Sequence, residues 1–559
     1  MDISECLDKA LYHKENGNFD SARKICLDIL NKSSGNYEAL RLLGLMYYEI
    51  NEYELAVKYL TKALAIKSDE LIIKPLAFSY YYMGKIPEAV KYLKICAEYE
   101  VSPEIYNKLI SFLMLDELNY HKAYPYSEIL YKKYPFDIEN IVNFGLICLY
   151  TGKFNESITF CNKAFMINPK YSKVWILKGI IEEVLNFNDE RARKCFKKAL
   201  ILGDKEAAYL NFCVNYSHSD YKKSNYYGRK LLQLKNIGAY NKVMYLMNTN
   251  YFAMRKMKRG YKYYVHRWDK TPDDDCLYVK IIKNSWQGGS HKDEKLFILS
   301  DLGYGDKIMY IRYLPFAAEK FKEVTVMCDD KLYMLFKRSY ANLGNVNFIY
   351  EKNEPKYDKA VTGTYLPQAL KMPDVSQIPF SDGYLRADKD KTKHFKSEYF
   401  NTDKLKAGLC WEAGSNEFRR LHNRSISFNY FKKMFTLNDK IQYYSFQLKT
   451  VSANESTLKL NNVIDLSRAI SDFDDTAALL KNLDILITVD TSVAHLAGAL
   501  GVNTFLILPY YAEWRWFDNI ETTEWYNSVR IFKQTHKISY ENEIRRIYNH
   551  LCNEQLMMN

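Results

Sequence analysis

The sequence predicts an α-helical repeat solenoid followed by a two-lobed α/β unit. Three observations predict it: small residues recur every 33 to 35 positions in the first half, short apolar strands alternate with helices in the second half, and a polar stretch lies between. The expected domains are residues 1–268 (solenoid), 269–294 (linker), 295–395 (first lobe) and 396–559 (second lobe with a C-terminal helix).

The first half repeats a helix–turn–helix unit. Its spacings of 34, 33, 34, 34 and 35 residues are those of the tetratricopeptide repeat, and they separate Ala22, Ala56, Ala89, Ala123, Ser157 and Ala192. Small residues are needed where paired helices approach closely, and Pro135 and Pro169 should stop second helices. A last hairpin is expected over 241–268. Stacked repeats form a concave surface suited to a peptide or a partner's helix, although a rigid spacer would show the same pattern.

Apolar strands are expected in two groups in the second half. The first lobe should contain strands at 296–299, 324–328, 346–350 and 359–361, and the second at 407–411, 443–447, 485–489 and 504–508. The polar stretch 386–404 should separate the lobes. Parallel strands alternating with helices place the carboxyl edges of both sheets on a cleft between the lobes.

Composition and charge suggest a cytoplasmic protein. The formal charge of +12 looks like a modest excess spread over 559 residues, which favours an acidic or phosphorylated partner only weakly and predicts no nucleic-acid binding. Eleven dispersed cysteines without a CxxC pair are typical of free thiols in a reducing compartment. The first residues lack the pattern of a signal peptide, and no apolar run is long enough for membrane insertion.

The most informative stretch is TVDTSVAHLAGALGVNTFLILP at 488–509. An apolar strand ends at Asp490, at the carboxyl edge where open α/β sheets bind ligands, and a helix carrying His495 follows at once. Thr491 and Ser492 can cap this helix, whose first free N–H groups would then form a phosphate or diphosphate site. The alternative is a buried strand–helix–strand unit with a core histidine.

The segment VDTSVAHLAGALG resembles the donor-binding motif of the bacterial heptosyltransferase-like (family 9) glycosyltransferases. It is most similar to bacterial proteins that join an O-GlcNAc-transferase-like domain of this kind to tetratricopeptide repeats. The segments MKRGYKYYVHRW at 257–268 and EWRW at 513–516, together with Trp525, extend the resemblance over about residues 250–550. It implies a GT-B-type fold of two Rossmann-like lobes, with a nucleotide-sugar as co-substrate.

The first lobe opens with FILSDLGYGDKIMYIRYLPF at 297–316. Gly303 and Gly305 should let the chain turn sharply out of a strand and place Asp306 at a helix start facing the cleft, where by itself an aspartate is more often an N-cap. The resemblance makes Asp306 the general base, and Arg312 belongs to a matching segment. Asp301 and Leu302 stand where the family usually has glutamate and glutamine, so the acceptor or sugar preference should differ.

The second lobe begins with GLCWEAGSNEFRRLHNRSIS at 408–427. A strand should close on a turn at Trp411, Gly414 and Ser415, and a basic loop then leads to Arg424 and Ser425. Arginine binds phosphate bidentately, although a solvated basic loop would have the same composition. The match to the family pattern W-x-x-G-S…R-S implies that Arg424 and Ser425 contact the diphosphate. Asp475 and Thr476 stand at an expected helix start, and the family has a similar stretch near the nucleotide. Arg515, in the matching closing segment, is a further candidate site residue.

Two D-x-D pairs, Asp273 with Asp275 and Asp388 with Asp390, have the spacing of a metal motif. They lie in lysine-rich or linker stretches rather than after an apolar strand, so we interpret them as solvated loops and expect no metal or other cofactor.

The hypothesis from sequence is a glycosyltransferase whose repeats dock a protein acceptor. Asp306 would take the proton of the acceptor hydroxyl, with inversion at the anomeric carbon, while Thr491, Ser492, His495 and Arg424 hold the donor. Asp490 would bind a ribose or donor hydroxyl or support its loop. Two alternatives stay open: a lipopolysaccharide or other glycan as acceptor, and a catalytically silent repeat scaffold. The sequence does not name the sugar, the nucleotide or the acceptor.

Overall fold

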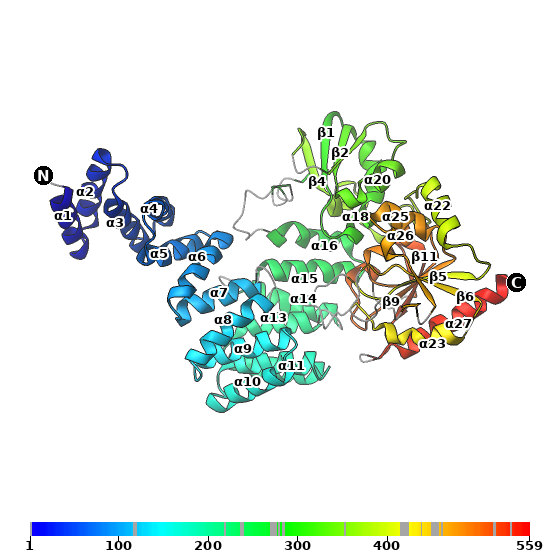
Figure 1. Cartoon of the computed structure of the whole chain (residues 1–559), viewed down its shortest axis with the longest axis horizontal. Helices are drawn as coiled ribbons and strands as arrows, with labels where there is room; N and C mark the ends of the chain where they lie inside the picture. The colour runs from blue at the N-terminus through cyan, green and yellow to red at the C-terminus, as the bar shows by residue number, and fades with distance from the viewer. Residues whose placement is uncertain are drawn as a thin grey trace. The chain divides into compact units, whose positions relative to one another are not determined.

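The computed structural model (Figure 1) describes residues 3–115, 120–216, 220–234, 240–268, 277, 280–281, 285–350, 354–413, 424–437, 439–448, 458–459, 462–517, 521–536 and 539–558. The chain divides into two compact units, one ending at Ala208 and one beginning at Tyr209. The second unit contains both sheets and the last helices of the solenoid.

The first unit is a succession of antiparallel helix pairs. Its helices are α1 (Ile3–Glu15), α2 (Phe19–Lys32), α3 (Tyr37–Glu49), α4 (Tyr53–Ile66), α5 (Glu70–Tyr82), α6 (Ile86–Tyr99), α7 (Pro103–Leu115), α8 (Tyr120–Lys133), α9 (Ile138–Tyr150), α10 (Phe154–Ile167), α11 (Ser172–Val184) and α12 (Asp189–Ile201). Each second helix packs on the first helix of its pair.

The repeat positions predicted from the sequence are confirmed. All six recurring small residues lie on the second helices and are completely buried. Glycines on the first helices also allow the two helices of a pair to approach closely. A Cβ atom at Gly44 would lie 2.4 Å from Leu60 Cδ2, and one at Gly179 would lie 2.3 Å from Phe196 Cε1. Helices α8 and α10 end two residues before their prolines, as expected.

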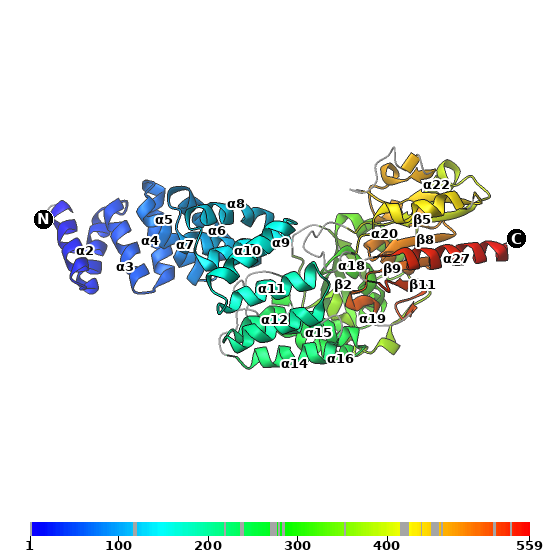
Figure 2. The same ribbon diagram turned by 90° about the horizontal axis from the view of Figure 1, so that it is seen from below.

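The helices that follow are α13 (Lys205–Tyr216), α14 (Tyr221–Leu232), α15 (Tyr240–Ala253) and α16 (Met257–Tyr264), with the 3₁₀ turn η1 (Val265–Trp268). The expected last hairpin is therefore present. Both views show α14, α15 and α16 packed in succession (Figures 1 and 2). The ring of Phe252 contacts Trp514 at 5.0 Å between centroids, and Tyr261 Oη donates to the carbonyl of Thr364 at 3.0 Å. The end of the solenoid thus shares a core with the α/β region. The side chain of Trp268, at the end of the same segment, lies outside the described residues.

The first sheet has four parallel strands in the order β3-β2-β1-β4: β1 (His291–Leu299), β2 (Phe321–Met327), β3 (Val346–Ile349) and β4 (Lys359–Thr362). The elements between and after them are α18 (Tyr304–Tyr310), η2 (Ile311–Tyr313), α19 (Leu314–Ala318), α20 (Asp330–Ser339), η3 (Gly363–Tyr365), α21 (Leu366–Ala369) and η4 (Val375–Gln377). All four strands expected here are found, and β1 begins before the predicted end of the linker.

The second sheet has the order β10-β11-β9-β8-β5-β6-β7 and is parallel except for the pair β10–β11. Its strands are β5 (Leu405–Cys410), β6 (Ile441–Ser445), β7 (Val463–Asp465), β8 (Ile485–Val489), β9 (Thr504–Leu508), β10 (Thr522–Thr523) and β11 (Tyr526–Lys533). The accompanying elements are α22 (Lys389–Tyr399), η6 (Phe428–Tyr430), α23 (Lys432–Leu437), η7 (Ser467–Ala469), α25 (Phe473–Leu480), α26 (Ser492–Ala499), η8 (Trp514–Trp516) and α27 (Glu541–Met558).

Both sheets reverse their strand order at one point. The strand β1 lies between β2 and β4, and β5 lies between β6 and β8, so the chain winds first one way and then the other. Such a switch point leaves a crevice at the carboxyl ends of the two central strands. The helix α18, after β1, packs on α26, after β8. The two switch points therefore face one another.

One expectation about the region between the lobes is wrong: Asp388 and Asp390 do not lie in a solvated loop. The polar stretch 386–404 separates the strands of the two sheets, but it contains α22, which packs on α25. Asp388 is the N-cap of α22 and accepts hydrogen bonds from the N–H groups of Asp390 and Lys391, both at 2.9 Å. It is therefore an ordered capping residue rather than part of a solvated loop.

Candidate functional site

A cavity of about 830 Å³ lies between the two switch points. Its walls come from α15, from the β1–α18 turn, from the carboxyl ends of β5, β6 and β8, and from η8. The residues that carry polar or charged side chains into this lining are Tyr245, Asn248, Thr249, Tyr264, Tyr304, Asp306, Tyr310, Thr364, Glu412, Arg424, Gln447, Asp490, Thr491, Ser492, His495 and Arg515. The predicted candidates Gly303 and Gly305 also line it. The volume is in the range of small-molecule sites.

A buried ion pair joins the two sides of the cavity. Asp306, in the first turn of α18, accepts hydrogen bonds from Arg515 at both carboxylate oxygens, with Nε–Oδ1 at 2.7 Å and Nη2–Oδ2 at 2.8 Å. Arg515 also lies 3.3 Å from Glu513 and stacks over Trp514. This bidentate geometry fixes the direction of the Asp306 carboxylate, whose remaining lone pairs can still accept.

Contrary to the expectation from the sequence, the sharp turn before Asp306 does not depend on Gly303 and Gly305. The backbone enters the left-handed region at Leu302 (φ 65°), whereas neither Gly303 nor Gly305 has a positive φ. Gly305 is instead needed for close packing between the lobes, because a Cβ atom there would lie 2.6 Å from His495 Cδ2. Gly303 is the N-cap of α18, so Asp306 does not take that position.

The second wall contains the segment after β8. Asp490 is 2% exposed, and its Oδ2 has no hydrogen-bond partner among the described residues, while Arg424 Nη1 lies 3.6 Å from it. Thr491 is the N-cap of α26, but its side chain makes no capping hydrogen bond and its hydroxyl lies 3.3 Å from that of Thr488. The first N–H groups of α26, at Ser492 and Val493, therefore face the cavity wall without a side-chain cap.

His495 is buried between the lobes. Its ring stacks on Trp516 with 4.8 Å between centroids, and Nδ1 lies 3.1 Å from the hydroxyl of Tyr526. Burial lowers the pKa of His495 to about 4, against the opposing effect of the nearby carboxylates Asp490 and Asp306. The imidazole is therefore neutral near pH 7, and it can act as a hydrogen-bonding group rather than as a cation.

Three predicted site residues, the donor contacts Trp411 and Ser425 and the further candidate Arg312, lie outside the cavity lining. Trp411 is completely buried against Phe428, with ring centroids 4.9 Å apart, and Ser425 Oγ accepts from the N–H of Ala413 at 3.0 Å. Arg312 is also fully buried, because its guanidinium donates to the carbonyl of Trp525 at 2.8 Å and to other groups of the core. These placements give all three residues structural roles. Gly414 and Ser415 lie outside the described residues, as does the basic loop with Arg419, Arg420 and His422.

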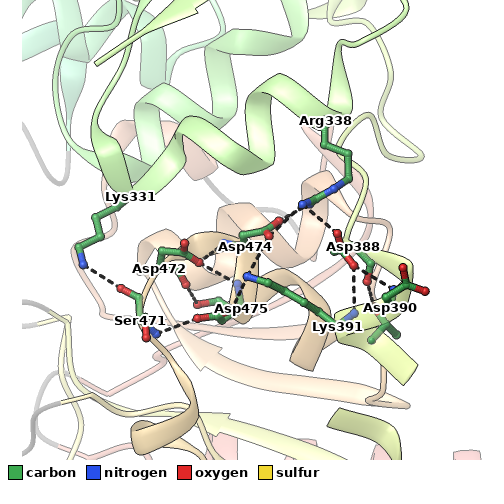
Figure 3. A network of polar contacts seen from close by, with 11 residues as sticks. Lys331, Arg338, Asp388, Asp390, Lys391, Ser471, Asp472, Asp474 and Asp475 are labelled. Carbon is green, nitrogen blue, oxygen red and sulfur yellow. Dashed lines mark hydrogen bonds and ion pairs between the residues drawn. The ribbon is translucent and has the colours of Figure 1, made fainter. Parts of the chain in front are cut away.

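Asp475 and Thr476 belong to a different cluster, between the lobes (Figure 3). Asp474, 1% exposed, is held by Arg338 of α20, with Nη2–Oδ2 at 3.0 Å, and by Lys391 of α22 at 3.1 Å. Lys391 also lies 2.6 Å from Asp475. Thr476 Oγ1 donates to the carbonyl of Asp472. Neither Asp475 nor Thr476 lines the cavity, so this network ties α20, α22 and α25 together.

The wall contributed by the solenoid was not predicted from the sequence. Tyr245, Asn248 and Thr249 of α15 line the cavity, and Tyr264 at the end of α16 donates to Asp301 Oδ2 at 3.0 Å. Asp301 Oδ1 in turn accepts from the N–H of Thr364 at 2.9 Å. The family-like segment 257–268 signalled a contact with the first lobe. Nothing in the pattern of α15 indicated that it borders the site.

Three further observations concern the described part of the chain alone. None of its helices is long and apolar enough to cross a membrane. Its residues contain no cluster of three histidine, cysteine or acidic side chains placed to hold a metal ion. The ten cysteines within it are free thiols, and most are buried.

Comparison with known proteins identifies the repeats. The family model of the tetratricopeptide repeat matches residues 37–70 and 138–171, which are the helix pairs α3–α4 and α9–α10. The chain is similar to Protein FlbA of Caulobacter vibrioides (24% identical over 307 residues, 50% of each chain). It is also similar to the TPR repeat-containing protein MJ1428 of Methanocaldococcus jannaschii (29% over 275 residues, 44% of each). The chain spans half or less of the length of these relatives.

Solved structures similar to this chain include other repeat proteins. One is YrrB, described as a TPR protein with an unusual peptide-binding site (16% identical, TM-score 0.28, covering 33% of this chain and 95% of YrrB). Another is yeast Tom70 (13% identical, TM-score 0.33, covering 49% and 59%). By the family match and the strand pairing, the chain contains tetratricopeptide repeats followed by an α/β region with parallel sheets. The resemblance of that region to a glycosyltransferase stays a prediction.

Proposed function

We propose that the second unit is a glycosyltransferase that moves a sugar from a nucleotide-sugar to a hydroxyl group. The observation that carries the proposal is the cavity, in which the switch points of two parallel sheets place a carboxylate, Asp306, opposite an arginine, Arg424, and the start of α26. Parallel α/β sheets bind nucleotides at this position. The resemblance at residues 489–501 supports the same assignment.

The second wall suits a diphosphate. Arg424 borders the cavity, and the N–H groups of Ser492 and Val493 lie at the positive end of α26. These donors would stabilise the charge that develops on the diphosphate as its bond to the anomeric carbon breaks. Asp490 has a buried acceptor oxygen without a described hydrogen-bond donor, which suits a ribose or sugar hydroxyl.

On the first wall Asp306 would act as the general base. The acceptor oxygen forms a bond to the anomeric carbon, the carbon–diphosphate bond breaks, and the proton of the hydroxyl passes to Asp306. Attack opposite the leaving group inverts the configuration. Arg515 would hold the carboxylate in place for this transfer.

Donor binding tests the second wall. Isothermal titration of the full chain with UDP, GDP, ADP and dTDP should find at least one ligand, and Arg424→Ala should weaken its binding by about 10- to 150-fold, the weight of a hydrogen bond to a charged group. Arg530→Ala is the matched control, because Arg530 is an exposed arginine of β11 in the same lobe. Equal losses in both variants, or no binding by any of the four nucleotides, would contradict the proposal.

Turnover tests the first wall. With the sugar donor of the nucleotide that binds, Asp306→Asn should lower transfer or donor hydrolysis by about 10²- to 10⁴-fold and leave donor affinity nearly unchanged. Asp329→Asn serves as control, because Asp329 is also paired with a cation, Lys307, but lies outside the cavity. Near-normal turnover by Asp306→Asn would remove this residue from the mechanism.

The repeats would dock the acceptor protein. Their concave surface suits an extended segment, and many weak contacts there would raise the local concentration of the acceptor at the cavity. The structure shows where to cut: residues 209–268 share a core with the α/β region, so a truncated chain should begin at Lys205, the start of α13. Once shown to be folded, it should keep donor hydrolysis and lose transfer to proteins.

Two other functions remain as alternatives. Transfer to lipopolysaccharide or another glycan would explain the cavity equally well, and it would be favoured if the truncated chain retained full transfer. A repeat scaffold without activity is consistent with the tetratricopeptide matches. It would be favoured if no nucleotide bound while proteins still associated with the repeats.

A further inference from the structure

Nearly all of the net charge of this protein lies in one short segment. Residues 209–270 contain thirteen lysines and arginines against two acidic residues, a formal charge of +11, whereas residues 1–208 contain 28 of each sign. The whole chain carries +12. The expectation that the charge is spread over the chain is therefore wrong: it is concentrated on the helices that close the solenoid.

Several cations of this segment are exposed on α14, on α16 and at the N-cap of α16. We call six exposed residues the basic face: Lys222, Arg229, Lys256, Lys258, Arg259 and Lys262. None of them forms an ion pair with any described residue, in contrast to Lys223 and Arg255, which pair with Asp220 and Glu524. The apolar side of α16, with Met257, Tyr261 and Tyr264, is buried in the core.

The two helices contribute to one continuous surface. Tyr263 of α16 stacks on Tyr251 of α15, with ring centroids 5.4 Å apart. Tyr263 also packs against the apolar cluster that contains Leu231 of α14, so α14 and α16 border the same core. Figure 2 shows the labelled ends of α14 and α16 at the same edge of this unit.

We propose that the basic face of α14 and α16 docks an acidic segment of a partner protein. Unpaired cations on neighbouring helices repel one another, and this repulsion is relieved when a partner supplies carboxylates. Charge complementarity of this kind speeds association and selects partners. The proposal is independent of sugar transfer, because the basic face is separate from the cavity lining.

The side chains around the cations favour a protein over a bilayer. Among the described side chains of residues 220–266, the large apolar ones that reach 36% exposure are Tyr226 and Tyr245, so no described Leu, Ile or Phe is available there to insert into lipid. Arginine and tyrosine are the residues enriched at the centres of protein interfaces.

Base stacking is also disfavoured on this surface. The ring of Tyr226 is covered by the ammonium of Lys230, 5.7 Å from its centroid, and one face of Tyr263 is occupied by Tyr251. A surface for single-stranded nucleic acid would instead offer open aromatic faces.

The test uses the full chain and a fluorescein-labelled peptide of about ten glutamates, followed by anisotropy at low and high salt. We expect binding that weakens as the salt rises from about 50 to 300 mM, because screening shortens the range of the charges. The variant Lys256→Glu/Lys258→Glu/Arg259→Glu/Lys262→Glu should lose at least about tenfold in affinity. The matched control is Lys24→Glu/Lys62→Glu/Lys197→Glu/Lys198→Glu, which makes the same change of charge at exposed sites of the first unit and should bind within about twofold of wild type.

Parallel titrations with phosphatidylserine vesicles and a 20-nucleotide single-stranded DNA separate the partner classes. The proposal is overturned if the basic-face variant binds the peptide like wild type, if no peptide binding is seen, or if only vesicles or DNA bind in a way that depends on these residues. Should the fourfold variant fail to fold by circular dichroism, Lys258→Gln/Lys262→Gln gives the same comparison with a smaller change of charge.

Discussion

The pair Asp306–Arg515 offers the sharpest test of how the site is held together. We consider Asp306→Asn, Arg515→Met and the double variant, all of which preserve side-chain size approximately. The pair is bidentate and its side chains are 6% and 15% exposed. Removing one partner of a fully buried pair costs about 3–5 kcal/mol, because the other charge stays behind unpaired.

Two features of the structure reduce that value. Both side chains border a cavity that water can enter, and Arg515 keeps a contact with Glu513 at 3.3 Å. We therefore expect each single substitution to destabilise the second unit by about 2–3 kcal/mol. The double variant should cost less than the sum of the two by about 1.5 kcal/mol or more, since no charge is left unpaired in it.

The assay is unfolding in guanidinium chloride followed by tryptophan fluorescence. Six of the seven tryptophans belong to the second unit and only Trp175 to the first, so the signal reports mainly on the unit that contains the pair. The two single variants and the double variant should be compared in one denaturant series. The comparison requires that the unfolding free energies of all three depend on denaturant concentration with the same slope. If the two substitutions add within about 0.5 kcal/mol, the pair does not stabilise the unit and the coupling inferred from its geometry is refuted.

Three further outcomes are expected. Gly305→Ala should cost about 1–3 kcal/mol, because its Cβ would meet the buried ring of His495 at 2.6 Å, whereas Gly344→Ala, in open space, should stay within about 0.5 kcal/mol; equal values in denaturant unfolding would contradict the close approach. Folded His495 stays neutral down to about pH 4, while an unfolded histidine binds a proton near pH 6.5, so the stability that its neutral form provides is complete above pH 6.5 and falls by about 3 kcal/mol towards pH 4. His495→Gln should lack this loss, and parallel stability curves for the two proteins between pH 7 and pH 4 would disprove it. Asp474→Asn should cost about 1–2 kcal/mol, because it removes the buried carboxylate between Arg338 and Lys391, which keep Asp388 and Asp475 as partners; a melting temperature unchanged from wild type would remove the network of Figure 3 from the stability of the unit.

The elements of this protein could be predicted from local pattern. The period of 34 residues determines which helices pair, because a small residue must recur wherever two helices touch. The eight predicted strands are all found, since each is a short apolar run between helices. The strands β7, β10 and β11 were missed, because β7 and β10 are only three and two residues long and β11 carries polar residues at positions 527, 528 and 530.

The positions of Asp306 and Asp490 were also predictable. Asp490 follows β8 directly, and Asp306 lies in the first turn of the helix that follows β1. The end of a parallel strand is a local property of the chain, and it already determines the edge of the sheet at which such a side chain lies. For the same reason the local pattern of residues 485–499 is enough to place the start of α26 at the site.

What the tertiary structure alone decided is which groups meet. Arg515 reaches Asp306 across 209 residues of sequence, α15 of the solenoid becomes a wall of the cavity, and Asp475 joins the network between the lobes rather than the site. Periodicity records only which side of an element is apolar. The partner of a buried charge depends instead on the packing of elements that are distant in the chain and on the free-energy cost of removing that charge from water. A local sequence pattern contains information on neither.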